Sequence, residues 1–237
     1  MTRPALWKVG VLAALMTIGW ASACGDVDDE DDTLGTDLES GFDDDDDDDA
    51  SAADFGDNGC GYDYGADPGC DLSTEACRNV VRINRDRFEN PEESDCAPRL
   101  KWSAELAAVA LAHSKDMCDR GFFDHKNPDN QTPFDRMEAS GITYVAAGEN
   151  IAFGTLGAYD ADDLEDGFMA EPACQVNHRS NILGRDFTHV GVGIYECSNY
   201  VVDGNNYGSV IILTQDFASF SYGDIREDEH DYCPALG

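Results

Sequence analysis

Two imidazoles and two carboxylates stand in short segments that are typical of turns and helix ends. Glu149 lies in a Gly-Glu-Asn-Ile segment, His178 begins a His-Arg-Ser-Asn-Ile-Leu segment, His125 ends a Phe-Phe-Asp-His segment, and Glu171 precedes Pro172. If they converged, two histidines and two glutamates would form a site for a divalent metal or for acid–base catalysis. Neutral imidazoles are good zinc ligands, and two of them leave coordination positions for water, a carboxylate or a substrate.

Each of these residues also has a purely structural interpretation. Glu149 can accept hydrogen bonds in a turn, His178 can brace a helix, and His125 can be an ordinary loop histidine. The spacing does not force convergence, because no HExxH helix is present. The serines beside His113 and His178 lie outside any Gly-x-Ser-x-Gly elbow, which argues against a serine hydrolase.

The elements that must position these residues begin with two helices. The first is expected to start near Ser73, a suitable N-cap, and the second opens at Ser103. Apolar residues of the second helix recur at helical spacing on one face together with a histidine: Leu106, Val109, Ala110, His113 and Met117. His113 is therefore expected to be a hydrogen-bonded core residue and is left out of the site.

Two shorter helices and a hairpin follow. One helix begins at Thr132-Pro133 and stops at Gly141, and residues 163–170 form another. Residues 189–195 alternate in hydrophobicity, and residues 209–217 form a Val- and Ile-rich run typical of a buried central strand. The turn between them falls in the Asp-Gly-Asn-Asn stretch. Helices first and a hairpin last indicate an α+β fold with a mainly antiparallel sheet.

This order of motifs resembles the CAP superfamily, which comprises cysteine-rich secretory proteins, insect venom antigens, plant pathogenesis-related proteins and a bacterial branch. The matching segments, in order, are Val81–Arg87, Leu100–Ser103, Leu106–Met117, Phe122–His125, Gly148–Ile151, His178–Leu183 and Thr188–Gly193. The resemblance covers residues 73–220 and implies a three-layer α–β–α sandwich with a central cleft. It does not imply one agreed activity.

The resemblance also assigns roles within that cleft. Many family members carry two histidines and two glutamates there, and in some the histidines bind zinc or another divalent ion. By motif, His125 and His178 are the metal candidates, and Glu149 and Glu171 are the catalytic candidates. Phe168 stands three residues before Glu171, where relatives carry a tryptophan. Zinc is the first expectation for the metal, and no nucleotide cofactor is expected.

Three functions follow from this assignment. The favoured one is binding of a divalent metal together with a small lipid or an envelope peptide. A metal-dependent hydrolase is the first alternative, with metal-bound water as nucleophile and Glu149 or Glu171 as base. The second alternative is a disulfide-braced interaction module whose cleft is vestigial. The expected assembly state is a monomer.

The N-terminal part of the chain is expected to direct export. Residues 1–23 combine early positive charge, a short apolar stretch and small residues, which is typical of a signal peptide. Cys24 follows directly and is a candidate for lipid attachment, which favours a cell-envelope lipoprotein over a secreted protein. Residues 24–57 are almost entirely polar and acidic and are expected to form a solvated tether. The membrane would then be contacted only through this anchor.

The remaining segments are rich in cysteine and acid. Residues 58–72 form a Cys/Gly-rich lead-in, and residues 221–237 form an acidic tail with Cys233. Reserving Cys24 for lipid leaves eight cysteines for four disulfides, and these are Cys60, Cys70, Cys77, Cys96, Cys118, Cys174, Cys197 and Cys233. Pairing of Cys96 with Cys118 and of Cys174 with Cys197 is predicted. The formal net charge of −34 argues against nucleic acid as a partner.

Overall fold

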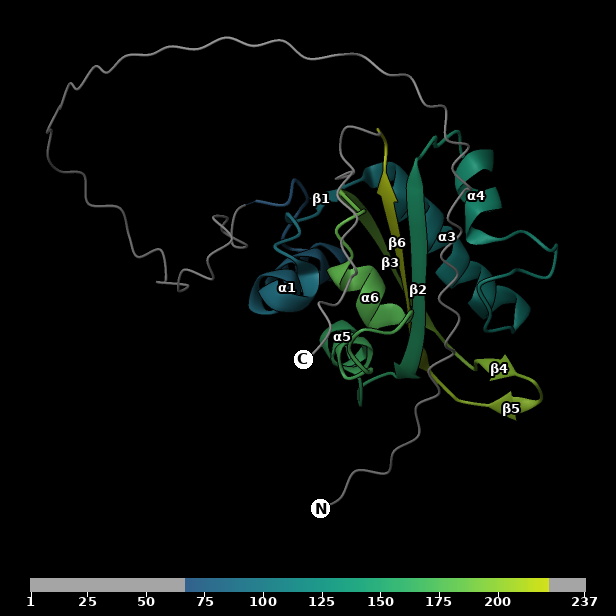
Figure 1. The fold of residues 1–237 in the computed structure, drawn as a ribbon. Coiled ribbons are helices and arrows are strands. Elements are labelled where there is room, and N and C mark those ends of the chain that lie inside the picture. Colours follow the sequence, from purple (N-terminus) through teal and green to yellow (C-terminus); the bar gives the residue numbers. More distant parts are fainter. Residues whose placement is uncertain (1–66, 222–237) are drawn as a thin grey trace, which may run out of the picture. The chain divides into compact units, whose positions relative to one another are not determined.

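The fold is that of a computed structural model, which describes residues 67–221 (Figure 1). The predicted signal peptide and acidic tether lie outside the described residues. So do most of the lead-in, nearly all of the C-terminal tail, and Cys24, Cys60 and Cys233.

A four-stranded sheet forms the middle layer, in the order β1-β3-β6-β2. β6 (Val210–Ser219) pairs antiparallel with both β3 (His189–Cys197) and β2 (Ala146–Thr155), and β1 (Lys101–Trp102) runs parallel to β3. Every residue of β6 is buried. The mainly antiparallel sheet and its central apolar strand are therefore confirmed.

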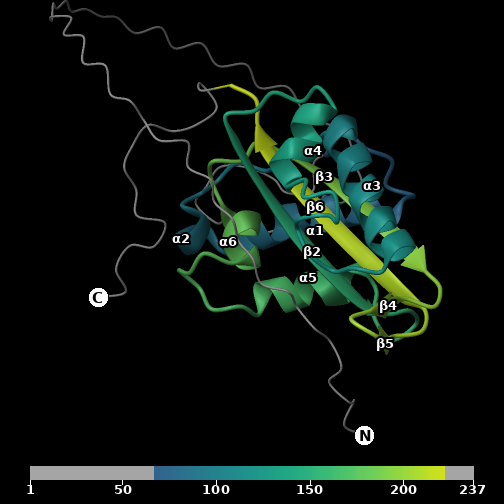
Figure 2. The ribbon, with the colours of Figure 1, turned by 90° about the vertical axis from the view of Figure 1, so that its right-hand side faces the viewer.

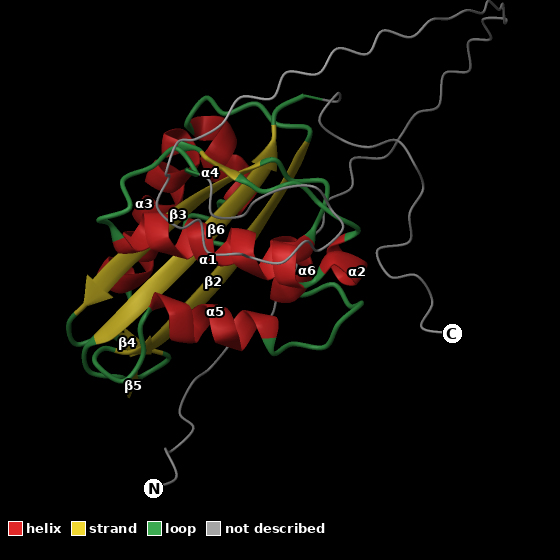
Figure 3. Cartoon of the chain, turned by 90° about the vertical axis from the view of Figure 1, so that its left-hand side faces the viewer, coloured by secondary structure: helices red, strands yellow, loops and turns green. Residues whose placement is uncertain are grey.

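Helices cover both faces of this sheet. α1 (Glu75–Glu89), α5 (Ala161–Met169) and α6 (His178–Leu183) lie on one face (Figure 3). α3 (Ala104–Arg120) and α4 (Pro133–Ala139) lie on the other (Figures 1 and 2). The short elements α2 (Pro91–Ser94), β4 (Val201–Val202) and β5 (Asn205–Asn206) complete the domain. The expected three-layer α–β–α sandwich is confirmed.

Strand alternation decides which side chains reach each helical layer. On β2, Ile151 and Phe153 pack in the apolar cluster beneath α3, whereas Ala152 packs in the cluster beneath α1 and α5. α3 approaches β3 closely because β3 carries glycine on that side. A Cβ atom added to Gly191 would lie 2.0 Å from the backbone nitrogen of Ala107.

Side-chain caps set most helix starts, as the sequence predicts. The Ser103 side chain accepts a hydrogen bond from the backbone of Leu106, and Thr132 forms a reciprocal capping box with Asp135. The first helix differs by one residue, since Thr74 rather than Ser73 accepts the capping hydrogen bond. α5 begins before residue 163 because Asp160 forms its own capping box.

The predicted disulfide pairs are wrong. Cys118 bonds to Cys197 with Cα atoms 5.7 Å apart, and Cys70 bonds to Cys77. The reason lies in the packing of α3 along β3, which brings the C-terminal end of the helix to the end of that strand. Cys96 and Cys174 are also disulfide-bonded.

These disulfides bear on where the domain works. Disulfides form and persist in oxidising compartments and are rare in the cytosol, so the protein is an exported one. Within residues 67–221, none of the helices combines the length and the apolar character needed to cross a membrane.

Candidate functional site

Glu149 lies in the middle of β2, an edge strand of the sheet, and not in the turn that its segment suggested. The small and polar residues of this segment resemble a turn, yet they pair with β6 over ten residues. Glu149 lies directly opposite Asp216 of β6, and its side chain is buried on the α3 face. The expected turn is therefore corrected to a strand that presents a buried carboxylate.

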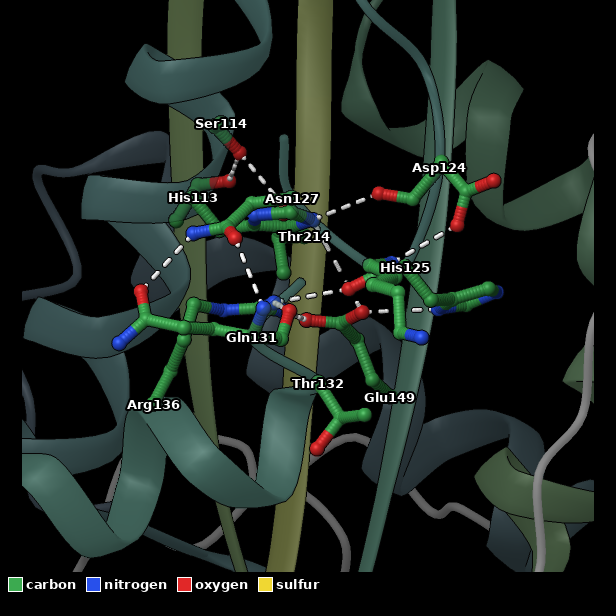
Figure 4. A network of polar contacts seen from close by, with 12 residues as sticks. His113, Ser114, Asp124, His125, Asn127, Gln131, Thr132, Arg136, Glu149 and Thr214 are labelled. Carbon is green, nitrogen blue, oxygen red and sulfur yellow. Dashed lines mark hydrogen bonds and ion pairs between the residues drawn. The ribbon is translucent and has the colours of Figure 1, made fainter. Parts of the chain in front are cut away.

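His125 and Glu149 form the first carboxylate–histidine pair (Figure 4). His125 Nδ1 lies 2.7 Å from Glu149 Oε1, and both side chains are buried. Arg136 of α4 forms an ion pair with the other carboxylate oxygen and donates to the carbonyl of His125 at 2.7 Å. The pair therefore draws on a loop, a helix and a strand within one stretch of the chain, since His125 and Glu149 are 24 residues apart.

The ionisation of Glu149 determines the tautomer of His125. Burial opposes the charge on this carboxylate, but the hydrogen bond from His125 and the positive charge of Arg136 outweigh it and lower the pKa of Glu149. An ionised carboxylate only accepts, so Nδ1 of His125 carries a hydrogen, and in the neutral imidazole the lone pair then lies on Nε2. This Nε2 is buried and has no hydrogen-bond partner among residues 67–221.

His113 lies near the same oxygen of the Glu149 carboxylate that His125 contacts. Its Nε2 is 3.1 Å from the carbonyl of Asp124 and 3.9 Å from Glu149 Oε1 (Figure 4). Burial lowers the pKa of His113 to about 4, so the ring is neutral at neutral pH. The prediction of a hydrogen-bonded core histidine is confirmed, but the sequence did not reveal its closeness to Glu149.

Asp216 is a buried acid that the sequence analysis did not single out. It lies opposite Glu149, and neither of its carboxyl oxygens has a hydrogen-bond partner among the described residues. Burial, followed by the negative charge of Glu149, raises the pKa of Asp216 well above its usual value. The sequence does offer one signal for this residue, because Asp216 is an acid within the Val- and Ile-rich run of residues 209–217.

His178 and Glu171 form the second carboxylate–histidine pair. His178 Nδ1 lies 2.7 Å from Glu171 Oε1, and the backbone N–H of His178 donates to Oε2 at 2.8 Å. Phe168 stacks on the His178 ring with centroids 4.6 Å apart. Because His178 is the first residue of α6, the carboxylate also binds the N-terminal end of that helix.

Consecutive residues of β2 link the two pairs. The Asn150 side chain donates to the carbonyl of His178 at 3.1 Å, and the Asn181 side chain donates to the carbonyl of Glu149 at 3.3 Å. The structure thus joins each predicted histidine to one predicted glutamate, and both pairs to one strand. Residues 67–221 contain no group of three or more His, Cys, Asp or Glu side chains that could hold a metal ion.

Comparisons with known proteins agree with the motif order. The model of the cysteine-rich secretory protein family, CAP, matches residues 79–217. An uncharacterized protein of Bacillus subtilis, YkwD, is 42% identical over 97 residues, which are 41% of this chain and 35% of that protein. An uncharacterized membrane protein of the same organism, YlbC, is 31% identical over 106 residues, or 44% and 29% of the two chains. The matched parts span about a third of these relatives.

Two solved structures are also similar. One is an extracellular protein containing an SCP domain from Bacillus anthracis, with 29% identity, a TM-score of 0.42, and 60% of this chain and 40% of that chain covered. The other is an outer surface protein of Borrelia burgdorferi, with 14% identity, a TM-score of 0.48, and 64% and 97% covered.

Proposed function

The chain belongs to the cysteine-rich secretory protein family, and from this premise we propose that its domain binds a divalent metal through His125 and His178. Zinc is the first choice, because neutral imidazole is one of its preferred ligands. The observation that carries the proposal is that each imidazole uses Nδ1 toward a carboxylate at 2.7 Å. That arrangement commonly orients a histidine whose Nε2 binds a metal.

The donor atoms fit such a metal. With Nδ1 donating to Glu149, the lone pair of His125 lies on Nε2, a buried atom with no hydrogen-bond partner in the described part of the chain. A buried acceptor without a partner is costly unless something else satisfies it. In His178, the same bond from Nδ1 to Glu171 leaves the lone pair on Nε2.

The two glutamates are assigned to orientation rather than to metal binding. Both oxygens of Glu149 are already engaged, one with His125 and one with Arg136. Both oxygens of Glu171 are engaged with the ring and the backbone of His178. Each carboxylate therefore holds an imidazole ring with one oxygen and is itself held by a second donor through the other.

This engagement favours a binding function over hydrolysis. A hydrolase base must accept a proton from water, and protonation of Glu149 or Glu171 would weaken the charge-assisted contacts that each makes to Arg136 or to the backbone of His178. A bound metal would supply open coordination positions for a ligand donor atom. We propose a small lipid or an envelope peptide as that ligand.

The proposed location follows from the N-terminal sequence. Cys24 would carry a lipid that anchors the exported protein to the cell envelope, and residues 24–57 would hold the domain away from the membrane as a solvated acidic tether. Release as a secreted monomer is the alternative. Mass spectrometry of the exported protein distinguishes the two, since only the anchored form carries a lipidated Cys24.

Zinc titration by calorimetry tests the metal site. The exported protein is compared with the His125→Ala/His178→Ala double variant and with His189→Ala, which removes a histidine outside both pairs. All three share the acidic run of residues 43–49, so nonspecific cation uptake is matched. One-to-one binding that only the double variant loses is expected. Identical heats from all three proteins would contradict the proposal and favour an interaction module with a vestigial cleft.

A further inference from the structure

Three amide side chains and one carboxyl group form a continuous hydrogen-bonded row, called the amide chain below. Asn181 Nδ2 donates to Asn150 Oδ1 at 2.8 Å, Asn150 Nδ2 donates to Gln215 Oε1 at 3.0 Å, and Gln215 Nε2 donates to Glu165 Oε2 at 2.5 Å. All four residues are buried. Gln215 Nε2 also donates to Asn79 Oδ1 at 2.8 Å, and Asn79 Nδ2 donates to Glu165 Oε2 at 3.2 Å. Both routes therefore end at the carboxyl group of Glu165, which is the terminal acceptor.

The amide chain reaches both carboxylate–histidine pairs. Asn150 Nδ2 also donates to the carbonyl of His178, and Asn181 Nδ2 also donates to the carbonyl of Glu149. It therefore holds the main chain at one residue of each pair. Glu165 itself lies on α5, and no hydrogen bond joins it directly to either pair among the described residues.

The direction of the amide chain depends on its terminal acceptor. A primary amide can turn over and exchange its NH₂ group with its oxygen, because the two ends have nearly the same shape. If Gln215 turned over, its NH₂ group would face the NH₂ group of Asn150, and two donors cannot bond. Asn150 would have to turn as well, and its bond to the carbonyl of His178 would be lost. Glu165 prevents this by accepting from Gln215 and by orienting Asn79, whose Oδ1 also accepts from Gln215.

We propose that Glu165 is a positioning residue for the candidate site and that it fixes the main chain at His178 and Glu149 through the direction of the amide chain. The expected effect on metal affinity rests on the proposed function. The coupling of Glu165 to the two pairs is independent of that function, because it is a property of the metal-free protein.

Glu165 also offers a titration that can be observed. Burial, followed by the negative charge of Asp86, raises the pKa of Glu165 to about 8. From α1, Asp86 and Arg82 face it, and on its own helix Asp166 pairs with Arg82. The strands β2 and β6 present only the uncharged amides of the chain. The uncharged acid therefore prevails at neutral pH, and ionisation follows at mildly alkaline pH.

The first test uses the metal-free full chain. The side-chain amide signals of Asn150 and the ring signals of His178 are followed by NMR across the titration of Glu165, at pH of about 7 to 9. Both sets of signals are expected to shift in the wild type and in the control Asp162→Asn, which removes an exposed acid of the same helix. Neither set is expected to shift in Glu165→Gln. Signals that stay still in the wild type, or that shift equally in Glu165→Gln, would overturn the proposal.

The second test measures zinc affinity. Glu165→Leu removes the acceptor and is expected to weaken binding about 10-fold, the lower end of the effect of outer-shell partners. Glu165→Gln keeps an uncharged acceptor and is expected to restore wild-type affinity. Equal affinity in Glu165→Leu and wild type would overturn the positioning role.

The two tests distinguish failure of the proposed function from failure of the role proposed for Glu165. If the wild type binds no zinc, the proposed function fails, and the NMR result still decides the role of Glu165. If Glu165→Leu does not fold, the near-isosteric Glu165→Gln variant and the wild type still give that decision.

Discussion

The two carboxylate–histidine pairs have the same bond and are built in different ways. In each, Nδ1 of a histidine lies 2.7 Å from a carboxylate oxygen. His125 and Glu149 are 24 residues apart and are joined by Arg136 from a third element, with the Glu149 side chain 1% exposed. His178 and Glu171 are seven residues apart, and the Glu171 side chain is 12% exposed.

The two pairs therefore differ in role: the first contributes mainly to the stability of the fold, and the second mainly to the orientation of its histidine ring. The Glu149 pair is part of the tertiary structure, because its charge balances a buried guanidinium group beside the sheet. The Glu171 pair is nearly local, since its carboxylate caps the helix that its histidine begins. We therefore expect the same chemical change to destabilise the fold at the first pair and mainly to release a ring at the second.

Glu149→Gln is expected to have the largest effect. It leaves the largely buried Arg136 without its counter-charge, and breaking a buried ion pair typically costs about 3 kcal/mol or more. Urea unfolding of this variant should show a loss of that size in the free energy of unfolding. A loss no larger than that of Glu171→Gln would break the distinction between the pairs.

Glu171→Gln is expected to affect stability less. One charge-assisted contact to the backbone of His178 is weakened, which costs about 1 kcal/mol. Zinc affinity should nevertheless fall about 10-fold, because the His178 ring loses its orienting carboxylate. Urea unfolding and zinc calorimetry on the same variant check the prediction. A large stability loss with unchanged zinc affinity would contradict it.

His113→Asn is expected to cost about 1 kcal/mol at neutral pH, as much stability as Glu171→Gln, from the lost bond to the Asp124 carbonyl, and it leaves both carboxylate–histidine pairs in place. The effect of His113→Asn on the free energy of unfolding should change sign in acid. The pKa of His113 is lowered to about 4, below its ordinary value of 6.5, so the folded state binds fewer protons between these values. Wild-type stability should therefore fall relative to the variant as pH falls through this window.

Acid unfolding of the two proteins, followed side by side, measures this difference. A constant stability difference between wild type and His113→Asn from neutral to acid pH would show that the His113 ring takes up its proton equally readily in the folded and unfolded states, which would contradict the lowered pKa.

The sequence predicted the local features of the fold well. The apolar face of α3 and the caps at Ser103 and Thr132 depend on residues within one or two turns, so their patterns are visible along the chain. The central strand β6 is visible because it opens with the apolar run Val210–Leu213, rich in Val and Ile, which is typical of a strand buried on both faces.

The features that were missed depend on distant partners. The segment around Glu149 is poor in the β-branched residues that mark a strand, with Ile151 and Thr155 among the ten residues of β2, and pairing with β6 makes it one. Asp216 and His113 meet Glu149 only after the sheet and α3 pack together. Disulfide partners likewise follow from the path of α3 along β3, which spacing between cysteines does not encode.

Crystals of the exported protein soaked in zinc, with anomalous scattering recorded at the zinc edge, test the central claim most directly. The account predicts one strong anomalous peak bound by Nε2 of His125 and Nε2 of His178, absent in the His125→Ala/His178→Ala variant. No peak beside these rings, or a peak bound instead by the oxygens of Glu149 or Glu171, would contradict it.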